Sequence, residues 1–111
     1  MYKNILLPIA LDHEMDIDGA INLAQHLLAE GGKITLVGVL EDLPGYAVEY
    51  VTVKPDTKPR KAMEDRLGAI AAGRSNLDVM VMTGKPGIAI AELAESSGAD
   101  LIVIGSHRPG I

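Results

Sequence analysis

Apolar residues in this chain fall into short uninterrupted runs that alternate with stripes of helical spacing. Residues 5–10 and 34–40 are almost continuously apolar, which is typical of strands buried on both faces of a sheet. Shorter runs at 78–83 and 101–104 predict two further strands. Pro8 lies inside the first run and cannot donate a hydrogen bond to a sheet, so we expect that strand to end there.

Between these runs, apolar residues spaced three and four apart predict three helices. The first stripe covers residues 17–28, with Asp16 as a suitable N-cap and the glycines at 31 and 32 as its stop. The second and third stripes lie at residues 63–71 and 90–94. Each helix therefore connects two consecutive strands.

Strands that alternate with helices predict an α/β fold, a Rossmann-like parallel sheet with helices on both faces. Right-handed crossovers favour the strand order 3-2-1-4. Residues 41–60 carry three prolines and predict a long loop. The fourth strand ends close to Ile111, which leaves an apolar edge uncovered. We expect one domain over residues 1–111 that is incomplete at its C-terminus, with a fifth strand missing or supplied by a partner subunit.

Composition narrows the class of function. A formal net charge of −5 and 3% aromatic residues argue against binding to nucleic acid, because such binding needs basic surface and stacking platforms. Absence of cysteine excludes disulfides and thiol chemistry. No apolar run approaches the roughly 20 residues of a membrane span, and no signal-peptide pattern opens the chain. We expect a cytoplasmic protein with no membrane insertion.

A ligand crevice is expected between the first and fourth strands, because ligands of open α/β sheets bind beyond the carboxyl ends of strands where the order reverses. Amides that follow Gly105 could form an anion nest, and Arg108 could contact a phosphate. The alternative is that Gly105 only opens a turn and that Arg108 is a solvated surface charge. The candidate ligand-binding residues are Pro8, Ile9, Ala10, Leu11, Asp12, Val39, Gly105, Ser106, His107 and Arg108.

Three segments resemble the universal stress protein family. Residues 2–9, Tyr-Lys-Asn-Ile-Leu-Leu-Pro-Ile, are similar to its opening strand. Residues 84–86, Gly-Lys-Pro, and 99–107, Ala-Asp-Leu-Ile-Val-Ile-Gly-Ser-His, are similar to its third- and fourth-strand signatures. The resemblance implies a Rossmann-like fold, usually a homodimer, and in many members a bound adenine nucleotide. It also implies a regulatory role in the stress response rather than metabolic catalysis.

The nucleotide signature of that family is Gly-x-x-Gly, followed further along by Gly-Ser or Gly-Thr. Gly105 matches the first glycine, whereas Arg108 stands at the second. Ala10 stands where the family has an aspartate, and Asp12 is the nearest carboxylate. The resemblance implies ATP, with or without magnesium, as the ligand. The two departures favour an alternative, a dimeric interaction module of the same fold that binds no nucleotide.

Other candidate chemistry is weak. Glu14, Asp16 and Asp18 resemble half of a calcium loop, but Gln25 stands where the bidentate glutamate would be needed, so the acids are better explained as helix-start residues. A hydrolytic or nucleotide-transferring enzyme would need a loop acid, for which Asp12 is the candidate. We expect no catalytic site and no metal site.

Two local features complete the candidate chemistry. Ser106 and His107 are adjacent, but neighbours at a strand end point to opposite sides and no nucleophile elbow is present. The basic residues Lys54, Lys58, Arg60 and Lys61 either cap the crevice or belong to a solvated loop, and the prolines favour the loop.

Overall fold

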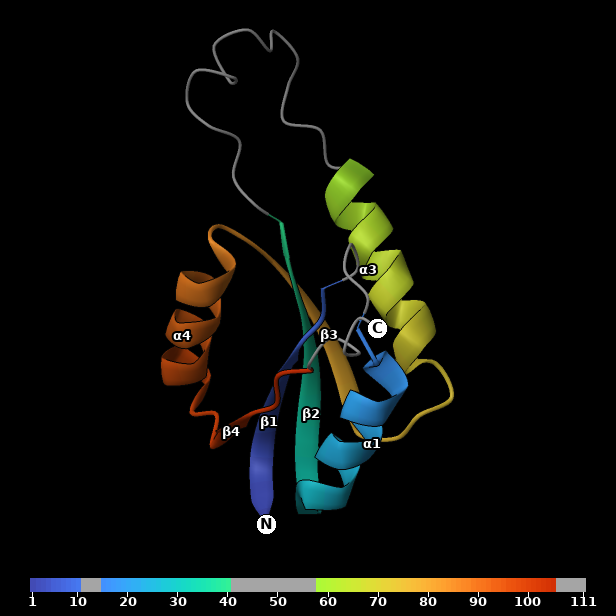
Figure 1. Cartoon of the computed structure of the whole chain (residues 1–111), viewed down its shortest axis with the longest axis vertical. Coiled ribbons are helices and arrows are strands. Elements are labelled where there is room, and N and C mark those ends of the chain that lie inside the picture. The colour runs from blue at the N-terminus through green and yellow to red at the C-terminus, as the bar shows by residue number, and fades with distance from the viewer. Residues whose placement is uncertain (11–14, 41–57, 106–111) are drawn as a thin grey trace, which may run out of the picture.

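The computed structural model describes residues 1–10, 15–40 and 58–105 (Figure 1). Its strands form one parallel sheet in the order β3-β2-β1-β4, which confirms the predicted fold class and strand order. The elements in chain order are β1 (Tyr2–Pro8), α1 (Ile17–Leu27), β2 (Leu28–Leu40), α3 (Lys58–Ala71), β3 (Leu77–Thr83), α4 (Pro86–Ser97) and β4 (Leu101–Ile102).

Helices cover both faces of the sheet, as the alternating pattern predicted (Figure 1). Ile5 and Leu7 of β1 pack in one apolar layer with α1 and α3, whereas Leu6 between them packs in a second layer with Leu93 of α4. All three β1 side chains are at most 1% exposed. An uninterrupted apolar run is needed here because successive side chains of a strand point to opposite faces, and both faces are buried.

β1 lies at the centre of the fold, between β2 and β4. Ile5 pairs with Ile34 on one side and with Leu101 on the other. The pairing continues beyond β1 and β4, because the Ile9 amide donates to the Val37 carbonyl at 2.8 Å and the Val103 amide donates to the Leu6 carbonyl at 2.9 Å. The carboxyl ends of β1, β2 and β4 therefore lie along the same edge of the sheet.

At the amino ends of the strands, Asp100 joins β1 to the turn that precedes β4. Its carboxylate accepts hydrogen bonds from the amides of Lys3, at 3.0 Å, and Asn4, at 2.9 Å, and these bonds hold the pKa of Asp100 below its usual value of 3.8. The Asn4 side chain donates to the Ser97 carbonyl at 2.8 Å. These bonds align the start of β1 with the turn that leads from α4 into β4.

The first helix ends earlier than its apolar stripe predicted. Leu28 is already extended, with φ −75° and ψ 131°, and begins β2. The cause is long-range pairing, since Leu28 lies opposite Tyr2 at the start of β1. The pairing overrides a local pattern that would otherwise carry the helix to the glycines at 31 and 32.

Two other boundaries differ from expectation. The fourth strand was expected to span 101–104 but ends at Ile102, and the side chain of Ile104 is 80% exposed. The second predicted helix begins at Lys58 rather than after residue 60, because Pro59 fits the first turn of a helix, where an amide proton is not needed. The remainder of the predicted loop lies outside the described residues.

None of the helices described has the length and apolar character needed to cross a membrane.

Candidate functional site

The first wall of the predicted crevice is the end of β1. Pro8 is half-buried and is the last residue of the strand. The side chain of Ile9 points into the core beside α1 and α3, and its amide donates a hydrogen bond to the Val37 carbonyl. Ala10 is half-buried and follows directly. All three side chains are apolar, so this wall offers a ligand a surface and backbone groups rather than side-chain chemistry.

The predicted floor is Val39, near the end of β2. The neighbouring Leu40 carbonyl accepts a hydrogen bond from Gly84, at 2.9 Å, on the β3 side. Successive residues of a parallel strand turn their backbone groups toward opposite neighbours. The amide and carbonyl of Val39 therefore face the β1 side, where the crevice is expected, while its side chain packs in the layer beneath α4.

The second wall begins at Gly105, directly after the β4 segment. A Cβ atom added at Gly105 would overlap the Cε atom of Met15 and lie 3.0 Å from its Cγ atom. Glycine fits here without displacing Met15, whereas any other residue would push that flexible side chain aside. Met15 directly precedes Asp16, the N-cap of α1. The exit of β4 is thereby packed against the start of α1, at the edge of the sheet that carries the end of β1.

The N-terminus of α1 already has its own anion. Asp16 accepts a hydrogen bond from the Gly19 amide through Oδ1 at 3.0 Å, which confirms it as the N-cap. A carboxylate in this position matches the positive end of the helix dipole. This carboxylate disfavours a second anion at the same end of α1. Within residues 1–10, 15–40 and 58–105, no cluster of histidine, cysteine or acidic side chains is arranged to hold a metal ion.

Half of the predicted site can be placed. The structure brings Pro8, Ile9, Ala10, Val39 and Gly105 to the carboxyl edge of the sheet. The other candidates, Leu11, Asp12, Ser106, His107 and Arg108, lie outside the described residues. Met15 was not among the sequence candidates. The sequence shows only that Met15 precedes an N-cap, which does not indicate a contact with Gly105. That contact depends on how β4 approaches α1.

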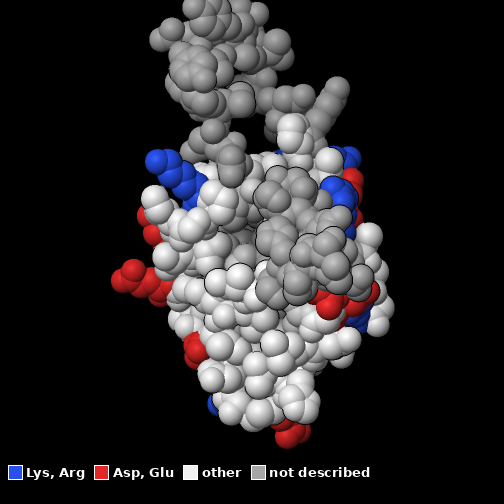
Figure 2. Space-filling view, viewed as in Figure 1, with Lys and Arg blue, Asp and Glu red and all other residues white. Residues whose placement is uncertain are grey.

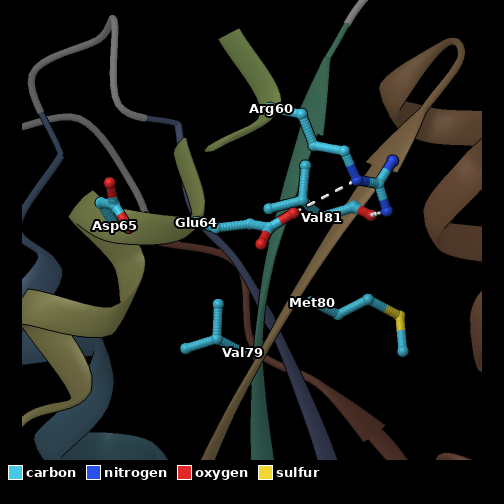
Figure 3. Close-up of a pocket in the computed structure, with 6 residues that line it drawn as sticks. All are labelled: Arg60, Glu64, Asp65, Val79, Met80 and Val81. Atoms are coloured by element: carbon cyan, nitrogen blue, oxygen red, sulfur yellow. Dashed lines mark hydrogen bonds and ion pairs between the residues drawn. The ribbon is translucent and has the colours of Figure 1, made fainter. Parts of the chain in front are cut away.

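A separate hollow of about 510 Å³ lies between α3 and β3 (Figure 3). The Arg60 guanidinium donates to the Val81 carbonyl at 2.8 Å and lies 3.2 Å from Glu64. The interpretation of Arg60 as part of a solvated loop was wrong, because this residue belongs to α3 and is fastened to β3. Arg60, Glu64, Asp65, Val79, Met80 and Val81 line the hollow.

Charged side chains lie around the rim of the face shown in Figure 2, and the described side chains that are visible between them are uncharged. The described residues of this face form no continuous basic surface of the kind that binds nucleic acid. The view agrees with the acidic net charge of −5.

The strand order, the two helical layers and the reversal between β1 and β4 define a Rossmann-like α/β protein. The model of the universal stress protein family matches residues 1–111, and the chain belongs to that family. Proteins of this family are generally stress-response proteins rather than classical enzymes.

Individual relatives support the assignment. Universal stress protein G of Escherichia coli O157:H7 is 29% identical over 119 residues, covering 100% of this chain and 83% of that protein. UspA from Lactobacillus plantarum has the same fold with a TM-score of 0.58 and 23% identity, covering 97% of this chain and 81% of that one. A universal stress protein solved in complex with cAMP has a TM-score of 0.61 and 18% identity, covering 92% of this chain and 75% of that one.

Proposed function

We propose that this protein is a cytoplasmic regulator of the stress response that binds an adenine nucleotide, ATP, between the carboxyl ends of β1 and β4. Binding would change how the protein associates with itself or with a partner. Its role is regulatory rather than catalytic, and this is supported by its family, whose members are generally stress-response proteins and not classical enzymes.

The reversal of strand order at β1 and β4 is the observation that carries this proposal. The two strands are neighbours in the sheet, and α1, which follows β1, packs on the opposite face from α4, which precedes β4. In open α/β sheets of this kind, ligands bind beyond the carboxyl ends of the two strands. A universal stress protein of the same fold has been solved with cAMP, itself an adenine nucleotide, which supports the choice of ligand.

Each candidate residue has a role in this proposal. Amides of Gly105, Ser106 and His107 hold phosphate oxygens, and Arg108 adds a charged contact. Backbone groups of Ile9, Ala10 and Val39 hold the adenine, with Pro8 and Leu11 as apolar walls and Asp12 near the ribose. A magnesium ion bound with ATP would neutralise part of the phosphate charge.

Calorimetric titration tests the proposal with Mg-ATP and, separately, adenosine. We expect saturable binding of Mg-ATP in the micromolar range, about −8 kcal/mol. Arg108→Ala should weaken Mg-ATP binding by roughly 10-fold or more, because a charge-assisted hydrogen bond is lost, and should leave adenosine binding unchanged. Arg66→Ala is the matched control, because Arg66 is an exposed residue of α3 and is not among the candidate ligand-binding residues.

Two results would contradict nucleotide binding at this crevice. One is the absence of binding heat from the folded protein, which would favour the dimeric interaction module that binds no nucleotide. The other is an equal loss of affinity in the Arg108 and Arg66 variants, since Arg66 lies on α3 rather than at the β4 exit.

We also propose that the protein forms a homodimer through the edge of β4. Support comes from Ile104, which is 80% exposed, and from Leu101 and Ile102, which are only partly buried on this outer strand. Light scattering after gel filtration should give a dimer mass for the natural sequence and a monomer mass for Ile104→Lys. A dimer in both proteins would place the interface elsewhere.

A further inference from the structure

Asn4 and Asp100 form a reciprocal pair at the amino ends of β1 and β4. The Asp100 amide donates to the Asn4 carbonyl at 3.0 Å, and the Asn4 amide donates to Asp100 Oδ1 at 2.9 Å. Asp100 Oδ2 accepts a hydrogen bond from the Lys3 amide at 3.0 Å. The Asn4 side chain in turn donates to the Ser97 carbonyl at 2.8 Å. Both carboxylate oxygens of Asp100 are therefore engaged, which holds this side chain in one orientation.

The apolar side chains of the two strands do not specify how β4 is aligned against β1. Residues 5–7 of β1 and residues 101–104 are all apolar. Ile5 is paired with Leu101, and a slip by one residue would pair it with Ile102 instead. The slip would exchange the two faces of β4, but it would again bring an aliphatic side chain to each buried face. Burial alone therefore leaves the register weakly specified.

The pair of Asn4 and Asp100 does distinguish one register from the next. Two carbonyls of β1 accept hydrogen bonds from the β4 side, Asn4 from Asp100 and Leu6 from Val103, whereas the odd-numbered Ile9 bonds to β2. Residues of a parallel strand face its two neighbours alternately, so even-numbered residues of β1 face β4. A slip by one residue would place Asp100 opposite an odd-numbered residue, whose backbone groups face β2. The reciprocal bonds to Asn4 would then be lost.

The ladder between β1 and β4 is short, which gives this pair a large share in the alignment. β4 comprises the two residues Leu101 and Ile102, and each has one partner on β1. Backbone pairing over so short a length is easily shifted. The side-chain bonds of Asn4 and Asp100 lie directly beside it and extend the connection between the strands toward their amino ends.

The register decides which residue leaves β4 beside the end of β1. Gly105 now stands there, packed against Met15. A slip by one residue moves the exit by about 3.3 Å along the strand. Ile104 or Ser106 would then take the place of Gly105. Each carries a Cβ atom that would displace Met15, so the backbone of the exit would not keep its present position.

We infer that Asn4 and Asp100 are positioning residues for the crevice, because they fix the register of β4 against β1 and thereby place Gly105 at the crevice mouth. The consequence for ligand affinity rests on the proposed function, whereas the register itself does not. Within the described residues, the buried Oδ1 atom of Asn4 has no hydrogen-bond partner, an arrangement that costs free energy. Asn4 therefore serves alignment more than stability, a role that polar groups in apolar surroundings are known to fill.

The register is measured directly by scalar couplings across hydrogen bonds in the full chain labelled with nitrogen-15 and carbon-13. In the natural sequence we expect a coupling between the Val103 amide nitrogen and the Leu6 carbonyl carbon. We also expect a single set of resonances for residues 101–105.

The double variant Asn4→Ala with Asp100→Ala removes the side-chain bonds of the pair. It should weaken the coupling between Leu6 and Val103 and should double the resonances of residues 101–105, because a second register becomes populated. If circular dichroism shows that the double variant is unfolded, Asn4→Ala alone replaces it, with doubled resonances again expected.

Val81→Ala is the matched control. Val81 is 5% exposed in β3, and β2 and β1 separate that strand from β4. Removing its buried methyl groups lowers the free energy of unfolding without altering the bonds between β1 and β4. The control should therefore keep the coupling and the single set of resonances. A general loss of stability would disturb both proteins alike, whereas a role in register disturbs the double variant alone.

Calorimetric titration with Mg-ATP tests the consequence for the crevice. Affinity should fall at least ~10-fold in the double variant, because displaced amides lose hydrogen bonds to phosphate, and should stay unchanged in the control. Absence of binding to the natural sequence would refute the proposed function, and the couplings would still decide the register.

Three outcomes would overturn the inference. The first is a double variant that keeps the coupling between Leu6 and Val103 and a single set of resonances. The second is the same disturbance of residues 101–105 in Val81→Ala. The third is unchanged Mg-ATP affinity in a double variant whose register has changed, which would show that the register does not position the crevice.

Discussion

Replacing Gly105 by alanine tests the packing that forms the mouth of the crevice. The added Cβ would overlap Met15 Cε and lie 3.0 Å from Cγ and 3.3 Å from Sδ, so Met15 must move. Overpacking costs about 1–3 kcal/mol, and a flexible, half-buried methionine favours the lower end. Lower chain entropy in the unfolded state returns about 0.4–1 kcal/mol. We expect a net loss of roughly 0–0.6 kcal/mol in the free energy of unfolding.

A double-mutant cycle isolates the contact. Met15→Ala removes the atoms that obstruct the new Cβ, so Gly105→Ala should cost less in that background, by at least ~0.5 kcal/mol. Urea denaturation followed by circular dichroism measures all four proteins. Gly68→Ala is the matched control, since nothing lies within 4 Å of its added Cβ, and it should stabilise α3 by about 0.5–1 kcal/mol. Additive effects of the two substitutions would show that the β4 exit does not pack on Met15.

Three further predictions concern stability. Asp16→Ala removes the N-cap of α1 and should cost ~1 kcal/mol in urea denaturation, and an unchanged midpoint would contradict the cap. Gly98→Ala places a Cβ on a residue with φ 69° and should cost about 1–2 kcal/mol, a loss that must exceed any effect of Gly68→Ala. The pKa of Asp100 is lowered in the folded protein. Its stabilising contribution is therefore fully present above pH 3.8, the pKa in the unfolded chain, and is lost as the pH falls through the folded-state pKa. Asp100→Asn should therefore destabilise at neutral pH and flatten the acid limb of the stability profile, whereas parallel profiles for both proteins would refute the role of its two amide bonds.

The parts of the fold that were predicted correctly are those where one local pattern has one physical solution. Ile5, Leu6 and Leu7 are consecutive and apolar, and a strand covered on both faces is the arrangement that buries all three. Pro8 ends that strand because it cannot donate to the sheet. The stripe at residues 90–94 belongs to α4, which ends at Gly98 in a left-handed conformation that glycine adopts readily.

Boundaries that depend on distant residues could not be predicted. Leu28 continues the apolar stripe of α1, but its pairing opposite Tyr2 makes it a strand residue. The residues around Leu28 give no indication that it pairs with Tyr2. Ile104 continues an apolar run in the same way, yet β4 ends at Ile102.

The candidate site likewise combines a residue that local sequence indicates with contacts that depend on distant residues. Gly105 could be proposed from sequence, because a glycine after a buried strand is a standard place for a ligand to approach the backbone. Its partner Met15 could not, since the contact joins residues that are far apart in the sequence. The bond from Arg60 to Val81 could not be predicted, because its acceptor is a backbone carbonyl of β3, which no side-chain motif indicates.

Whether the crevice holds an adenine nucleotide is tested most directly by amide chemical shifts of the nitrogen-15-labelled protein during titration with Mg-ATP. We expect saturable shifts at Ala10, Val39 and Gly105, with the amides of Leu77 and Val79 on the outer strand unchanged. Shifts that cluster away from the ends of β1 and β4, or none at millimolar Mg-ATP, would contradict nucleotide binding at this site.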